Sequence, residues 1–312
     1  MKNTSFIKPL TLVLISILVI IALSCSEKPH DTPTQGSLVM ITSEDIFPVI
    51  DIQVKEFMRV YEKTKIRNIS SSTRNAIVQM LNDSVKVIVV PRNLNDEEKN
   101  VVEKNSLDVS STKIAYDGVA VIANVRSGIT QITVQALHDI LTGRITRWTA
   151  LHHAALTSRI VVGMCGINSG TYEYIKQRIV PDTAFAPVIE RCSTSPDVIS
   201  FVSEHPNAIG FVPVSWLKHY TDTVTVLEVG DPNFKSDSTS TEMEYFSPEQ
   251  AYMYKGYYPL TRPVYLFVHN ADGGVETGFA SFAAGVEGQR IIVKNGLVPA
   301  TMPVRLVHLN NQ

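Results

Sequence analysis

The chain has 312 residues, of which 44% are apolar, with 28 basic against 30 acidic side chains and a net charge of -2. This length suffices for two ordinary domains, and the balanced charge lacks the basic surplus on which sequence-independent nucleic-acid binding depends. Three cysteines cannot build a disulfide scaffold, and no CxxC or HExxH spacing occurs. We therefore expect no nucleic-acid partner and no structural metal site.

The start of the chain has the pattern of an export signal, residues 1–24. Two lysines precede the apolar stretch Leu10–Leu23, which is shorter than the about 20 residues of a membrane-spanning helix but suits a signal-peptide core. Cys25 follows small and apolar residues, as in a bacterial lipobox. The pattern predicts lipidation of Cys25, a tether over residues 25–35, and a chain anchored in the periplasm or cell envelope, at the inner or the outer membrane. An ordinary signal peptide or an uncleaved anchor is the alternative.

Short β-rich runs then alternate with amphipathic stretches, which indicates an α/β protein with mainly parallel sheets. In the first such stretch, Ile50, Val54 and Phe57 recur at helical spacing. The predicted strands are Ser37–Ile41, Ile66–Ile69, Val85–Val90, Gly118–Ala123, Arg159–Gly163, Val188–Arg191 and Pro263–Val268. The predicted helices are Val49–Tyr61, Asn75–Leu81, Val134–Thr142, Tyr172–Ile179, Pro196–Glu204 and one long helix within Glu276–Asn295. Between them, Asp231–Glu242 is rich in Ser, Thr and Asp and is expected to be a solvated surface loop.

Several segments of the chain follow one another in an order that is specific to one family. They are Asp117–Asn124, Leu137–Trp148, Ser169–Thr171, Asn207–Val212, Tyr258–Pro263, Glu287–Ile292 and Gly296–Pro299. In these segments the chain resembles the phosphate ABC transporter substrate-binding proteins, also called PstS-like proteins. The resemblance implies the type II periplasmic binding fold, which has two α/β lobes joined by two crossover strands. Lobe 1 would comprise residues 36–120 plus 262–312, and lobe 2 residues 121–261.

The same resemblance implies a function. It suggests an extracytoplasmic solute-binding lipoprotein that captures phosphate or a related small oxyanion in the cleft between its lobes, with an ABC permease as a possible partner. No cofactor, catalytic residue or oligomer is implied, so we expect a monomer that is not an enzyme. The alternative is a protein that keeps the fold, has lost phosphate binding, and acts as a sensor or as an interaction module of the cell envelope.

Two short motifs would contribute ligand-binding groups. Ser169, Gly170 and Thr171 open a predicted helix, whose free N–H groups suit an anion, while helix capping alone would also explain them. The second motif is a turn that precedes the second predicted helix. The resemblance implies that Thr73, next to Ser72, matches a hydroxyl residue of the family's binding site.

Other positions depart from the family's pattern of binding residues. Cys165 stands where the family has an Arg, Ile167 where it has an acid, and Lys86 where it has an Asp. Arg74 replaces a Gly, and Asp45 lies near a position of a small hydroxyl residue. Our hypothesis is that Asp45 pairs with Lys86 or Arg74 inside the cleft, so that the protein's own carboxylate occupies part of the anion site. The simpler interpretations are a helix cap for Asp45 and solvated side chains for Lys86 and Arg74.

The two remaining cysteines each end a predicted strand of the same lobe. If the strands that end at Cys165 and Cys192 are neighbours, an oxidising compartment permits a disulfide between them, while free thiols are the alternative. No base is placed beside Cys165 by sequence, so a nucleophilic role has no support.

Overall fold

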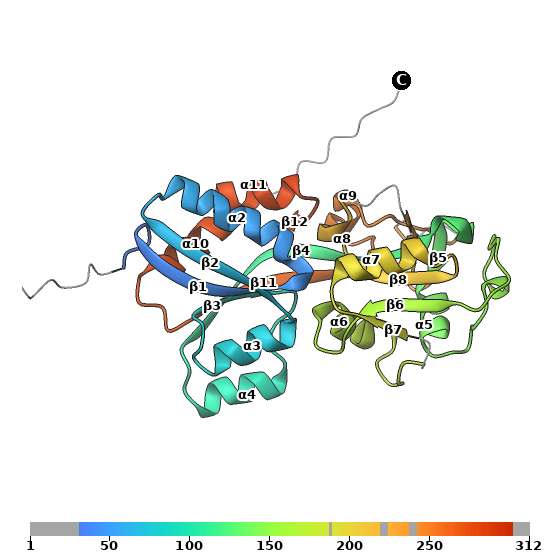
Figure 1. Ribbon diagram of the computed structural model, residues 1–312, viewed down its shortest axis with the longest axis horizontal. Coiled ribbons are helices and arrows are strands. Elements are labelled where there is room, and N and C mark those ends of the chain that lie inside the picture. Colours follow the sequence, from blue (N-terminus) through green and yellow to red (C-terminus); the bar gives the residue numbers. More distant parts are fainter. Residues whose placement is uncertain (1–30, 187–188, 219–223, 237–241, 302–312) are drawn as a thin grey trace, which may run out of the picture.

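A computed structural model describes residues 31–186, 189–218, 224–236 and 242–301 of the chain. The predicted signal peptide, Cys25 and most of the predicted tether therefore lie outside the described residues. Two lobes lie side by side along the longest axis (Figure 1). One mixed sheet runs through both in the order β2-β1-β3-β11-β4-β8-β6-β7. No helix in the described ranges is long and apolar enough to cross a membrane.

Lobe 1 is built on the strands at the start of the chain and one late strand. Its strands are β1 (Gly36–Ser43), β2 (Thr64–Ser71), β3 (Val87–Val90) and β11 (Thr261–His269). The first three are mutually parallel, whereas β11 runs antiparallel to β3. Its helices are α2 (Phe47–Val60), α3 (Thr73–Leu81), α4 (Asp96–Lys104), α10 (Val275–Ala284) and α11 (Val286–Lys294).

Helices cover both faces of this half of the sheet. Along β3, Val87 and Val89 pack into the cluster that includes residues of α2, α10 and α11, while Ile88 and Val90 pack into the cluster with α3. Successive side chains of a strand point to opposite faces. A short strand that is apolar throughout is therefore buried on both sides, as the run of apolar residues predicts.

Lobe 2 repeats this arrangement with the middle of the chain. Its strands are β6 (Val161–Cys165), β7 (Ile189–Cys192), β8 (Ala208–Pro213) and β9 (Val224–Val226), and a separate pair is formed by β5 (Gln131–Thr133) and β10 (Glu228–Gly230). Both β7 and β8 are parallel to β6. Its helices are α5 (Val134–Leu141), α6 (Gly170–Ile179), α7 (Ser195–Glu204), α8 (Val214–Leu217) and α9 (Gln250–Tyr254).

One long strand, β4 (Val109–Asn124), belongs to both lobes. Its first part pairs with β11 and with the short β12 (Val298–Pro299), and its second part pairs with β8 and β9. The predicted α/β class, with helices on both faces of the sheet, is confirmed. The residue bounds that the resemblance gives to the lobes, 36–120 with 262–312 and 121–261, stay a prediction.

Several elements differ from the sequence prediction: β8 and the short β5, β9 and β10 were not predicted as strands, and β4 begins at Val109, before the predicted Gly118. Helix α4 was not predicted, because its face carries few apolar residues and none of it is buried; a capping box of Asn95 and Glu98 starts it instead. The single long helix predicted within Glu276–Asn295 is wrong. The chain forms α10 and α11 there, and the extended backbone of Gly285 separates them.

Candidate functional site

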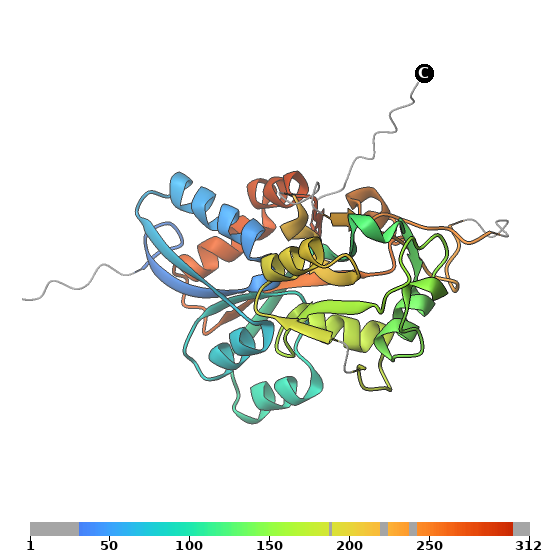
Figure 2. The ribbon, with the colours of Figure 1, turned by 45° about the vertical axis from the view of Figure 1, so that its right-hand side comes forward.

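The two lobes meet where β1 ends and the 3-10 helix η1 (Glu44–Ile46) begins. Two helices of lobe 2, α6 and α7, begin directly across from this turn, as their hydrogen bonds to Asp45 and Glu44 show. In Figure 2 the blue start of α2 and the gold α7 lie against each other at this boundary. Helix N-termini carry free N–H groups and the positive end of the helix dipole, so both are anion-binding positions.

The carboxylate of Asp45 occupies the N-terminus of α6. Its Oδ1 accepts hydrogen bonds from the backbone N–H of Thr171 at 2.8 Å and from the Thr171 hydroxyl at 2.5 Å. Its Oδ2 accepts from the backbone N–H of Gly170 at 3.1 Å. The side chain of Ser169, which precedes the helix, caps it by accepting from the N–H of Tyr172. Asp45 thus places a negative charge at a helix N-terminus, a position that favours anions.

Lobe 1 completes the coordination of the same carboxylate. Oδ2 also accepts from the hydroxyl of Ser43 at 2.7 Å and lies 3.3 Å from the hydroxyl of Thr73, and Oδ1 lies 3.2 Å from Nη2 of Arg262. Asp45 is 1% exposed. We call the groups that surround this carboxylate the oxyanion cradle; its residues are Ser43, Thr73, Gly170, Thr171 and Arg262.

The ionisation of Asp45 follows from these contacts. Burial alone would raise its pKa, but the charge of Arg262 and the hydrogen bonds from Thr171, Ser43 and Gly170 outweigh burial and hold the pKa below its usual value. Asp45 is therefore an anion inside the protein, and the cradle is a site that stabilises an anion.

The cation of the cradle is shared with a second carboxylate. Arg262 on β11 lies opposite Asp117 on β4, and its Nε and Nη2 donate to Oδ2 of Asp117 at 3.1 and 2.8 Å. Burial raises the pKa of Asp117 to about 6, although Arg262 opposes the shift. Among the described residues, Nη1 of Arg262 and Oδ1 of Asp117 have no hydrogen-bond partner. The buried guanidinium therefore has spare capacity to donate.

Glu44, the neighbour of Asp45, makes an analogous contact at α7. Its carboxylate accepts from the backbone N–H and from the hydroxyl of Ser195, both at 2.9 Å. Burial, reinforced by the charge of Asp45, raises the pKa of Glu44 to about 7. Lobe 2 also contacts the backbone of this turn, because Ser215 Oγ donates to the Asp45 carbonyl at 2.7 Å and Trp216 Nε1 to the Glu44 carbonyl at 2.9 Å.

Close approach of the lobes depends on Gly170. A Cβ atom at this position would lie 2.5 Å from Pro91 Cγ and 2.6 Å from Thr73 Oγ1. Only a glycine allows the N-terminal turn of α6 to meet lobe 1 at this distance. The Gly in the Ser169–Thr171 motif is thus explained by packing between the lobes as well as by its N–H group.

The structure brings together some of the residues predicted for the site. Asp45, Thr73, Gly170 and Thr171 meet in the cradle. Ser169 lies at its edge as the cap of α6. The hypothesis that the protein's own carboxylate lies at the anion site agrees with this geometry.

Three predicted residues lie elsewhere. Lys86 precedes β3 and pairs with the exposed Asp272 at 2.7 Å. Ser72 caps α3 by accepting from the N–H of Asn75. The side chain of Arg74 lines a surface cavity of about 210 Å³. The hypothesis named the wrong cation for Asp45. The half-buried Lys86 and the exposed Arg74 keep their charged groups near water, and the cation beside Asp45 is Arg262 instead.

Sequence reasoning missed Ser43, Glu44, Asp117, Ser195 and Arg262. A signal existed for two of them. Asp117 and Arg262 are charged residues within runs that are otherwise buried strands, and buried charges are rare unless paired. For the others, the sequence does not show that Ser43 meets Thr73, 30 positions along the chain, or that Glu44 meets Ser195, 151 positions along the chain.

Cys165 and Cys192 lie directly opposite each other on β6 and β7, so the predicted neighbourhood of their strands is confirmed. Both are free thiols. Burial raises the pKa of the Cys165 thiol well above its usual value and that of Cys192 to about 11. The described residues contain no group of three or more His, Cys, Asp or Glu side chains arranged to hold a metal ion.

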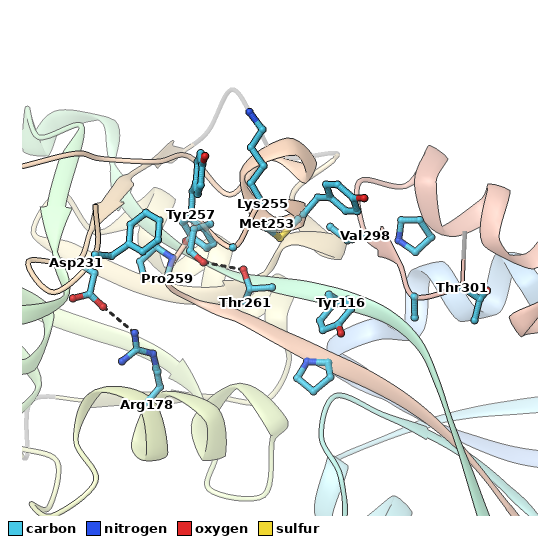
Figure 3. Close-up of a pocket in the computed structure, with 17 residues that line it drawn as sticks. Tyr116, Arg178, Asp231, Met253, Lys255, Tyr257, Pro259, Thr261, Val298 and Thr301 are labelled. Carbon is cyan, nitrogen blue, oxygen red and sulfur yellow. Dashed lines mark hydrogen bonds and ion pairs between the residues drawn. The ribbon is translucent and has the colours of Figure 1, made fainter. Parts of the chain in front are cut away.

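A larger cavity of about 840 Å³ lies away from the cradle, along the strands that connect the lobes. Figure 3 shows Arg178 of α6 paired with Asp231 at one end, while Tyr116 of β4 and Thr301 lie toward the other. None of its lining residues belongs to the cradle. The cradle is therefore distinct from this cavity.

Comparison with known proteins adds the family. Residues 27–287 match a family model described as the PBP superfamily domain. The phosphate-binding protein PstS of Pseudomonas aeruginosa is 22% identical over 279 residues, which cover 85% of this chain and 83% of that protein. The phosphate-binding protein PstS of Staphylococcus aureus is 20% identical over 251 residues, 79% of this chain and 73% of that protein.

Solved structures agree on the fold. A putative phosphate ABC transporter substrate-binding protein from Clostridium perfringens, with bound phosphate, superposes with a TM-score of 0.71 at 21% identity, over 85% of this chain and all of that one. An ABC-type phosphate transport receptor from Vibrio cholerae gives a TM-score of 0.65 at 19% identity, with the same coverage of 85% and 100%.

Proposed function

The chain belongs to the PBP superfamily, and on that basis we propose that it is an extracytoplasmic solute-binding protein that captures phosphate or a related small oxyanion between its lobes. An ABC permease would receive the solute. The protein binds without chemical conversion, because the superfamily supplies substrate-binding components. Relatives named as phosphate-binding proteins in two bacteria support the choice of solute.

The oxyanion cradle is the observation that carries this proposal. Two backbone N–H groups of one helix, three hydroxyls and a buried guanidinium surround one pair of carboxylate oxygens. Such donors suit phosphate and carboxylate oxygens alike, because hydrogen bonds to an ionised acceptor are the strong ones. The two lobes that supply them would close around a solute by hinge motion at β4 and β11.

Calorimetric titration of the purified protein with phosphate, arsenate, sulfate and nucleotides at fixed salt tests this function. We expect saturable binding of phosphate or of one related oxyanion. Thr171→Val, which removes one hydroxyl of the cradle at nearly constant volume, should weaken that binding, whereas Thr277→Val on α10 should leave it unchanged. Silence across the whole panel would reject the importer function.

A second function is favoured by the occupant of the cradle. Because Asp45 holds the position of the anion, the chain could serve as a sensor or an envelope interaction module that has lost phosphate binding. A phosphate dissociation constant below about 10 μM would exclude this alternative, since it corresponds to a binding free energy of about 7 kcal/mol.

The N-terminal part of the proposal concerns attachment to the membrane. We propose a signal peptide over residues 1–24 and lipidation of Cys25, which would tether a monomer to the cell envelope. Mass spectrometry of the protein from membranes should show a lipid-modified residue 25. Cys25→Ala should release the chain into the soluble fraction, and an unmodified Cys25 in membrane-bound protein would contradict lipidation.

A further inference from the structure

We propose that the turn of Glu44 and Asp45 is an internal ligand: it closes the two lobes without any solute, and an external oxyanion enters the cradle only by displacing the Asp45 carboxylate. The part concerning the oxyanion rests on the proposed function. The closure does not, because it depends only on groups of this chain.

Asp45 already uses the donors of the cradle, apart from Nη1 of Arg262, which has no partner among the described residues. Each oxygen of Asp45 accepts from lobe 1 and from lobe 2: Oδ1 from Thr171 and Arg262, and Oδ2 from Gly170 and Ser43. At 1% exposure the carboxylate is sealed from water. A solute oxyanion needs these same donors, so it and Asp45 exclude each other.

Glu44 adds a second contact that holds the two lobes together. Two consecutive residues of lobe 1 place their carboxylates on the N-termini of two different helices of lobe 2. Ser215 and Trp216 of lobe 2 fix the two backbone carbonyls between them. The turn thus contacts lobe 2 at four points. Because these groups belong to one chain, they close the lobes without the translational and rotational entropy cost of binding a separate solute.

A ligand that belongs to the chain competes with an external ligand and so weakens the binding of the external one. An intramolecular group acts at an effective concentration in the millimolar range or higher, and the apparent affinity of a solute falls with the fraction of molecules whose cradle is open. One charge-assisted hydrogen bond corresponds to roughly 10- to 100-fold in affinity. We therefore expect removal of the Asp45 side chain to strengthen phosphate binding at least about tenfold.

The variant Asp45→Ser tests both parts. Small-angle scattering of the unchanged protein should give the same radius of gyration with and without phosphate. Asp45→Ser should expand in the absence of phosphate, contract when phosphate is added, and bind it at least about tenfold more tightly by calorimetry. The matched control is Asp272→Ser, which removes the same charge from an exposed position of lobe 1 and should behave as the unchanged protein.

A second measurement does not require the variant to fold. In the unchanged protein without any oxyanion, hydrogen exchange should be slow at the amides of Gly170, Thr171 and Ser195, because these N–H groups already donate hydrogen bonds to carboxylates of the chain. Fast exchange that phosphate slows would overturn the internal ligand. So would an Asp45→Ser protein of unchanged radius and unchanged phosphate affinity.

The outcomes separate the two proposals. If neither protein binds any oxyanion while the three amides are protected and Asp45→Ser expands, the internal closure stands and the proposed function fails. If the three amides exchange fast and phosphate binds the unchanged protein tightly, the function stands and the internal ligand is rejected.

Discussion

Arg262 lies between two buried carboxylates, and this position decides what its loss would do. The side chain is 1% exposed, with Asp45 and Asp117 on either side. A buried ion pair can add little net stability over an apolar replacement of the whole set, but removing one partner leaves a buried charge without compensation. Here a single cation compensates two acids.

Arg262→Met should therefore lower the free energy of unfolding by about 3–5 kcal/mol, as measured by urea denaturation at neutral pH. The matched control is Arg290→Met on α11, whose partner Glu287 and whose own side chain are both more than half exposed. That change should cost less than about 1 kcal/mol. Similar costs for the two variants would show that Arg262 does not hold the buried carboxylates.

Glu44 adds a pH dependence whose sign follows from its burial. The pKa of Glu44 is raised from 4.5 to about 7. Between these two pH values Glu44 keeps its proton in the folded protein, whereas it has lost the proton in the unfolded chain. The stabilisation from Glu44 is thus fully present below 4.5 and is lost as pH rises through 7.

Glu44→Gln, which cannot ionise, imitates the protonated form and tests this sign. The stability of the unchanged protein relative to the variant should decrease from about pH 5 to about pH 8 in urea denaturation. Glu287→Gln, at an exposed acid of α11, should give the same difference at both pH values. A Glu44→Gln difference that does not change with pH would contradict the raised pKa.

At the scale of elements, the start of α6 is fitted to lobe 1 with little space to spare. The cap, Ser169, and the donor, Thr171, are local features of the motif, whereas the need for Gly170 arises from contact with Pro91 and Thr73 of the other lobe. The requirement for glycine at position 170 thus comes from packing between the lobes, and the helix propensity of the surrounding residues does not reveal it.

Gly170→Ala should lower the free energy of unfolding by about 1–3 kcal/mol, because the added Cβ would force the lobes apart. Gly166→Ala, in the same loop, is the control, since a Cβ there would have no heavy atom within 4 Å. It should be neutral or slightly stabilising, because alanine restricts the unfolded chain. The comparison is made by urea denaturation, and equal effects at the two glycines would exclude a packing role for Gly170.

Helices and strands were predictable from the sequence mainly where they bury apolar residues. They were less predictable where an element buries none. Helix α2 follows from the spacing of its apolar residues and strand β3 from its continuous apolar run, but α4, which buries no residue, follows from neither. Within the site, the Ser169–Thr171 motif was visible because it is contiguous. Arg262 was missed because its role depends on register between β11 and β4, which pairs residues 145 positions apart.

At the scale of the whole molecule, closure is shared between the cradle and a second bridge. Arg92 donates to Glu98 on α4 of lobe 1 at 2.7 Å and to Glu173 on α6 of lobe 2 at 2.5 Å. Both the Asp45 contact and the contact with Glu173 need the lobes closed. They are therefore linked through one equilibrium, even though they are different interactions.

This linkage predicts non-additive stabilities. Once Asp45→Ser has opened the lobes, Arg92 has already lost Glu173, so Arg92→Met should cost less in that background than in the unchanged protein. The coupling free energy from urea denaturation of the single and double variants should exceed about 0.5 kcal/mol. Arg290→Met combined with Asp45→Ser should add within about 0.5 kcal/mol, because the pair of Arg290 with Glu287 lies within α11 and does not cross the lobes. Additivity in both double variants would mean that Asp45 does not govern closure.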